Sequence, residues 1–61
     1  MHYEIERLSV TGRWLRRTGK SGKKYKLLSE AQREAAIARD RGSVVRIIRI
    51  TDDGLRTVVE E

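Results

Sequence analysis

Few residues in this chain have the type and spacing to do chemistry. Gly19-Lys20-Ser21 has the ending of a phosphate-binding loop, but that motif needs a glycine five residues before Gly19, where Trp14 stands. Glu4 and Glu6 share one face of a predicted strand, as catalytic carboxylates could, yet the sequence beside them is not typical of a pocket. We therefore expect neither a nucleotide site nor an acid–base pair, and Glu4 and Glu6 are expected to be solvated or paired with nearby arginines.

Metal and cofactor sites find little support either. Asp52 and Asp53 precede Gly54 without further oxygen ligands spaced around them, and Asp-Asp-Gly is ordinary turn chemistry. The chain has no cysteine, which excludes a disulfide framework and a thiolate metal site. Its one histidine, His2, nearly excludes a histidine-based metal site as well. We expect no metal, no cofactor and no enzymatic activity.

One group of residues favours binding instead. Trp14 lies among arginines and Tyr25 among lysines, on two predicted neighbouring strands. Aromatic rings between basic side chains offer stacking or cation-π surfaces beside charges that neutralise phosphate. The alternative is that Trp14 is simply the largest core side chain of a protein without phenylalanine. The predicted binding residues are Arg13, Trp14, Arg16, Arg17, Lys20, Lys23, Lys24, Tyr25 and Lys26.

The charge is unevenly distributed along the chain. Residues 7–29 hold eight basic residues and no acid, whereas the remainder holds six basic and all nine acidic residues. Such asymmetry indicates a nucleic acid or an acidic protein surface as partner. The alternative is a solvated basic face that only aids solubility.

Length and composition set the class of protein. With 61 residues, 38% hydrophobic and 38% charged, the chain fits one globular domain, residues 1–61. In so small a domain the free energy gained by burying apolar surface is nearly cancelled by the loss of chain entropy. Binding to a partner or self-association would therefore add stability. No apolar run reaches the ~18 residues of a membrane span and no signal peptide is evident, so we expect a cytoplasmic protein that binds no membrane.

The first half reads as a β-meander. Apolar and polar residues alternate along residues 3–10, as in a strand, but the alternation shifts once by one residue. A β-bulge near Arg7 would explain this shift. Thr11-Gly12 is a turn signal before a second strand from Arg13 to Arg17. A loop at residues 18–22 precedes a third strand that runs from Lys23 or Lys24 to Leu28.

The second half reads as a helix and a hairpin. Ser29 and Gln32 fit a capping box, a helix follows from Glu30 to about Arg41, and Gly42 supplies the C-cap position. Helical spacing puts Ala31, Ala35 and Ala38 on one stripe, with Ile37 on its flank. Strands at residues 44–51 and 55–60 flank Asp52-Asp53-Gly54. The first of these is apolar on both faces, which hints at a homodimer or a sheet-mediated complex.

A resemblance adds to this interpretation. Residues 28–47 resemble a stretch of small phage proteins that include an anti-CRISPR inhibitor of type I-F surveillance complexes. The matching positions are Leu28, Ser29, Ala31, Arg33, Ala35, Gly42, Val44, Arg46 and Ile47. The resemblance implies a compact α+β inhibitor that binds a protein and nucleic-acid machine and blocks DNA access. It covers a third of the chain and assigns no functional residue.

The sequence thus predicts an α+β fold: an antiparallel sheet of four to five strands with one helix packed on one face. It predicts a non-enzymatic, phage-type binding protein that engages a host nucleic-acid-handling complex through its basic meander, in the host cytoplasm if a phage encodes it. The alternative is an accessory protein that binds DNA or RNA directly. A homo-oligomeric structural module without a ligand is a third hypothesis.

Overall fold

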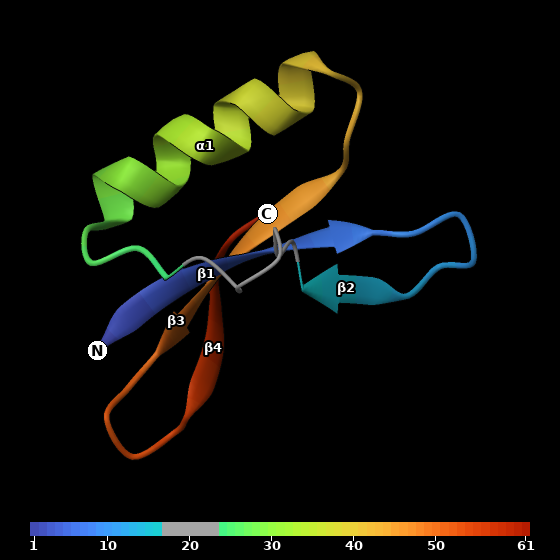
Figure 1. Cartoon of the computed structure of the whole chain (residues 1–61). Helices are drawn as coiled ribbons and strands as arrows, with labels where there is room; N and C mark the ends of the chain where they lie inside the picture. Colours follow the sequence, from blue (N-terminus) through green and yellow to red (C-terminus); the bar gives the residue numbers. More distant parts are fainter. Residues whose placement is uncertain (17–23) are drawn as a thin grey trace.

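The computed structural model describes residues 1–16 and 24–61, and it shows one helix lying across a four-stranded antiparallel sheet (Figure 1). The strand order is β2-β1-β3-β4, so β1 and β3 are central. This confirms the predicted α+β fold with the helix on one face. The elements are β1 (His2–Leu8), β2 (Trp14–Arg16), α1 (Leu28–Asp40), β3 (Val45–Ile50) and β4 (Arg56–Glu60).

The β3–β4 hairpin turns where the sequence predicted. The amide of Thr51 donates to the Leu55 carbonyl at 3.0 Å, and the Gly54 amide donates to the Thr51 carbonyl at 2.9 Å. Gly54 has φ 88°, a left-handed conformation that a side chain would strain. The Asp53 carboxylate accepts a hydrogen bond from the Thr51 hydroxyl. The prediction that Asp52-Asp53-Gly54 forms a hairpin turn is confirmed.

The predicted bulge near Arg7 is wrong. β1 pairs with β3 without interruption from His2 opposite Ile50 to Arg7 opposite Val45. The phase shift in the sequence arises because Leu8 lies on the sheet face opposite the helix, beside Trp14, and Val10 lies in the turn after β1 and is fully exposed. The register shift of the sheet lies instead between β3 and β4, at the step from Ile47 to Ile48.

The third strand of the predicted meander is reduced to a single bridge. Tyr25 exchanges two backbone hydrogen bonds with Tyr3 of β1, at 2.7 and 2.9 Å, and the helix already begins at Leu28. The prediction of a strand ending at Leu28 is therefore wrong. Of its two predicted starts, Lys23 lies outside the described residues, and Lys24 is not in a strand.

The ends of α1 differ in how well the sequence predicted them. The N-cap is Leu27, whose amide donates to the Glu30 carboxylate at 3.3 Å, so Ser29 is already inside the helix. At the other end Gly42 has φ 88° and its amide donates to the Arg39 carbonyl, while the next amide bonds the Ala38 carbonyl. These two bonds are a Schellman motif, which confirms the predicted C-cap.

The core lies between α1 and the two central strands. The sheet contributes Ile5, Val45 and Ile47, and the helix contributes the predicted alanine stripe, with Ile37 exposed on its flank. Because alanine projects so little, the helix lies close against the sheet. The buried members of this cluster are Ile5, Tyr25, Ala31, Ala35, Ala38, Val45 and Ile47.

Enlarging the alanine stripe should destabilise the fold. Ala35 is fully buried, so Ala35→Leu is expected to lower the free energy of unfolding by about 1 to 3 kcal/mol through overpacking. The matched control is Ala36→Leu, because Ala36 is exposed on the same helix. Chemical denaturation followed by circular dichroism measures both. Equal stability of the two variants would contradict close packing of this stripe.

Candidate binding surface

The two basic segments meet at one edge of the sheet. Residues 14–16 pair with residues 8–6 of β1, and Tyr25 pairs with Tyr3 on the same side of that strand. Arg13, which precedes β2, and the lysines on either side of Tyr25 therefore follow one edge. We call this the basic edge and define it by Arg13, Arg16, Lys24 and Lys26.

The described basic side chains of this edge face solvent. Arg13, Lys24 and Lys26 are exposed, and none of them forms an ion pair with a described residue. Arg16 stands opposite Glu6 in the strand register, which places its backbone at the same edge. The other predicted binding residues, Arg17, Lys20 and Lys23, lie outside the described residues.

Trp14 lies on the sheet face opposite the helix. It pairs with Leu8, which is not part of the helix-side core, and its ring is partly buried. The guanidinium of Arg46 from β3 stands over this ring, 4.2 Å from its centroid. Trp14 thus makes a cation-π contact within the protein.

Tyr25 requires a correction. The sequence placed it among lysines as a stacking surface, but only 7% of the residue is exposed and it belongs to the core cluster under α1. Its backbone bridge to Tyr3 directs the ring inward, whereas its lysine neighbours face solvent. Tyr25 therefore positions the basic edge and offers no ring face for stacking.

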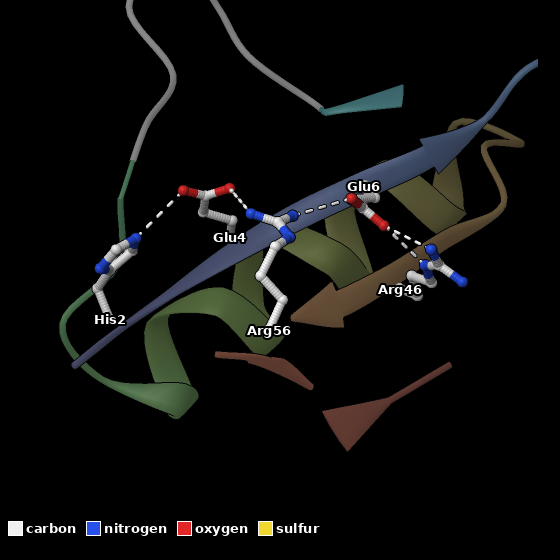
Figure 2. A network of polar contacts seen from close by, with 5 residues as sticks. All are labelled: His2, Glu4, Glu6, Arg46 and Arg56. Atoms are coloured by element: carbon white, nitrogen blue, oxygen red, sulfur yellow. Dashed lines mark hydrogen bonds and ion pairs between the residues drawn. The ribbon is translucent and has the colours of Figure 1, made fainter. Parts of the chain in front are cut away.

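A network of polar contacts, most of them ion pairs, lies on the sheet face opposite the helix (Figure 2). Arg56 of β4 lies 3.3 Å from the Glu4 carboxylate and 3.0 Å from the Glu6 carboxylate, so it bridges the two. Glu6 also accepts from Arg46 at 2.8 Å, and His2 lies 3.1 Å from Glu4. We call these five residues the sheet network.

The sheet network explains what Glu4 and Glu6 do. Glu4 is only 6% exposed, although it lies on the face without the helix, and a buried carboxylate requires compensating partners. Arg56 supplies one such partner and joins the two carboxylates to β4. These ion pairs link the side chains of three strands, β1, β3 and β4, and so stabilise the sheet. Both carboxylates are bound to guanidinium groups.

Sequence reasoning left Glu4 and Glu6 either solvated or paired with nearby arginines, and the structure shows the second, but the sequence did not identify Arg46 and Arg56 as the partners. The signal was present, because Glu4 and Glu6 alternate with apolar residues in one strand and Arg46 does so in another. Their pairing depends on register, which brings Glu6 opposite Arg46 and which no local pattern fixes. Arg56 lies two strands away from β1, so its role depends on the sheet order as well.

An open hollow on this face has a volume of about 140 Å³. Ligand pockets usually measure roughly 300 to 1,000 Å³, so the hollow is too small to enclose a typical organic substrate. Its guanidinium groups are also already bound by carboxylates. The lining residues are Glu6, Arg46, Ile48, Arg56 and Val58.

Asp52 and Asp53, in the turn after β3, form contacts within the chain itself. The hydrogen bond from the Thr51 hydroxyl, assisted by the Leu55 amide, holds the pKa of Asp53 below its ordinary value. The terminal amine of Met1 contacts Asp52 and lowers the pKa of that carboxyl. Both carboxylates are therefore charged at neutral pH and bound to donors of the chain itself.

No helix in the described parts of the chain combines the length and the apolar character needed to cross a membrane. The chain matches no protein-family model, and no curated protein or solved structure resembles it closely enough to indicate a relationship.

Proposed function

We propose that this protein is a non-enzymatic binding protein or inhibitor of the phage type, and that its basic edge engages a nucleic-acid-handling complex of the host. One observation carries the proposal: among the described residues, no carboxylate is bound to the exposed positive charges of this edge. Glu4 and Glu6 are bound to Arg46 and Arg56, whereas Arg13, Lys24 and Lys26 have no carboxylate among the described residues. Unmatched surface charge is free to attract an acidic partner.

The size of the basic edge suits an extended acidic surface. Trp14 and Tyr25 pair with residues 8 and 3 of β1, so the basic groups beside them are spread over five strand positions. At about 3.3 Å per residue, this separation is roughly 17 Å. One DNA strand carries about five phosphates over that length, and an acidic protein surface that mimics DNA presents comparable charge.

The aromatic side chains favour a protein complex over direct binding of single-stranded nucleic acid. Sequence-tolerant binding of single strands relies on free aromatic faces on which bases stack. Tyr25 is buried here, and one face of Trp14 is occupied by Arg46. The resemblance of residues 28–47 to small phage inhibitors supports the same choice. Charge is then the main determinant of recognition.

Charge reversal at the basic edge tests the proposal. Arg13→Glu combined with Lys24→Glu should weaken binding at least tenfold while the fold survives, because both side chains are exposed. The matched control, Arg33→Glu with Arg41→Glu, makes the same change of four charges on exposed residues outside the edge and should retain binding. Tagged protein is used to capture partners from bacterial host lysate, and circular dichroism verifies folding.

Nuclease treatment and the salt dependence of binding distinguish a protein partner from a nucleic acid. A captured protein complex that resists nuclease, and whose affinity depends mainly on association rate, supports the proposal. Binding to purified duplex DNA with a logarithmic salt slope near about −3.6, as expected for about four phosphates, would support direct nucleic-acid binding instead. Full binding by the folded Arg13→Glu, Lys24→Glu variant would refute both, and the charge would then be a solvated face.

A further inference from the structure

β2 is a short edge strand whose packing depends on one side chain. It spans three residues, Trp14–Arg16, and pairs with β1 alone among the described residues (Figure 1). Of its described side chains, Leu15 is 44% exposed, whereas the Trp14 ring is partly buried on the face opposite the helix. Two-stranded hairpins are marginally stable without further packing. The attachment of β2 to the sheet therefore depends largely on Trp14.

The contact that holds Trp14 comes from beyond the neighbouring strand. Arg46 belongs to β3, and β1 lies between β3 and β2 in the sheet. The guanidinium carbon of Arg46 is nevertheless 4.2 Å from the centroid of the Trp14 ring, so the two side chains meet above β1. A cation at this distance is attracted by the negative face of an indole ring. The Arg46 side chain is only 23% exposed, so the attraction is stronger than at an open surface.

Glu6 of β1 fixes the orientation of Arg46. One carboxylate oxygen of Glu6 lies 2.8 Å from both Nε and Nη2 of Arg46. The other oxygen accepts from Arg56 at 3.0 Å, and Figure 2 shows Glu6 between the two guanidinium groups. Charge-assisted hydrogen bonds are among the stronger ones in proteins, and two of them restrict the rotation of one guanidinium. β1 and β3 therefore hold the cation in place for the Trp14 ring.

We propose that Arg46 is a positioning residue for the basic edge, because through Trp14 it fixes β2 against β1. Arg13, just before β2, and Arg16 within it are thereby held along that edge. The lysines of the edge have their own attachment, since the backbone of Tyr25 bonds to β1 at 2.7 and 2.9 Å. Groups that are held in place before a partner arrives bind it at a lower cost in entropy. The effect on binding rests on the proposed function, whereas the attachment of β2 does not.

Two neighbouring amides of β1 report the two sides of this strand. The Leu8 amide donates at 2.8 Å to the carbonyl of the residue before β3. On the other side, the Ser9 amide donates to the Arg13 carbonyl at 2.8 Å. Since hydrogen-bonded pairs recur every second residue in an antiparallel ladder, the Arg7 amide faces Leu15 of β2. Hydrogen exchange at Arg7 therefore measures detachment of β2, and exchange at Leu8 measures opening of the central pair of strands.

Removing either side chain of the contact should release β2 alone. Arg46→Met and Trp14→Leu should each speed exchange of the Arg7 amide by about three- to tenfold, as expected for a partly desolvated cation-π contact. Exchange at Leu8 should stay nearly unchanged, as should both amides in the control Arg49→Met, which alters the helix side of the same strand. The double variant should exchange no faster than the faster single variant. An unchanged Arg7 amide, an equal rise at Leu8 or additive effects would overturn the proposal. If Arg46→Met does not fold, Trp14→Leu decides, because it leaves the ion pairs of the sheet network in place.

Binding to the captured host complex tests the consequence for the basic edge. Trp14→Leu changes no charge, yet it should weaken binding by about threefold or more, because the edge must then be ordered on binding. Arg13→Glu should cost less affinity in the Arg46→Met background than in the native chain, since Arg13 is no longer held in place there. Native affinity in a folded variant whose β2 is released would refute the positioning role. If the native chain captures no complex, the proposed function fails, and exchange at Arg7 still decides whether Arg46 holds β2.

Discussion

Replacing Ile47 by alanine is expected to lower the free energy of unfolding by about 2 to 5 kcal/mol. Ile47 is fully buried in the central strand β3, opposite Ile5 of β1. The helix above it presents alanines, which are too small to fill the cavity that the substitution leaves. Because small domains are marginally stable, a loss of this size should unfold a large fraction of the molecules.

Urea denaturation followed by circular dichroism measures this loss, with Ile37→Ala as the control. Ile37 is exposed on the flank of α1, so the same deletion there removes little buried surface and improves helix propensity slightly. The native chain and Ile37→Ala should thus differ by less than about 0.5 kcal/mol. An Ile47→Ala variant as stable as Ile37→Ala would mean that the core lies elsewhere. Binding by the basic edge should fall together with stability, since β1 carries that edge.

Local patterns predicted the elements whose stabilising contacts are themselves local. The alanine stripe follows from helical spacing, and the turn at residues 52–54 follows from the left-handed conformation that Gly54 adopts. The N-terminus of α1 was placed two residues late, because Glu30 reaches back to the Leu27 amide and outcompetes the Ser29 cap. Residues 24–28 were predicted to form a strand, but the helix that begins at Leu28 with Leu27 as its N-cap takes up the end of this segment.

Contacts that depend on the order of the strands could not be predicted from local sequence patterns. Whether Tyr25 faces solvent or core is decided by its bridge to Tyr3, 22 positions earlier in the chain. The position of Arg46 over Trp14 is decided by the order β2-β1-β3. The composition of the basic edge was readable as a charge run, but its alignment along one side of β1 was not. The affinity of that edge for a host complex stays a prediction.

The other large effect is expected from Arg56, whose removal should destabilise the fold by about 1 to 3 kcal/mol. Arg56→Met keeps the length of the side chain but leaves the buried Glu4 carboxylate without its guanidinium partner and unties β4 from β1. Breaking a fully buried pair costs roughly 3 to 5 kcal/mol. The Arg56 side chain is 38% exposed, so solvent screens its charge and the smaller range applies. Thermal and urea melts measure the change.

The double variant Glu4→Gln, Arg56→Met separates a broken ion pair from lost packing. If the cost comes from the loss of the Glu4–Arg56 ion pair, neutralising Glu4 should recover part of the stability lost in Arg56→Met. Arg33→Met is the control, because Arg33 is exposed on α1 and forms no ion pair with a described residue. Strict additivity of Glu4→Gln and Arg56→Met would show that the charge of Glu4 is not the cause of the loss, and that Arg56 acts through its other contacts, among them the ion pair with Glu6. A recovery would instead identify the charge of Glu4 as the reason why an arginine is required at the start of β4.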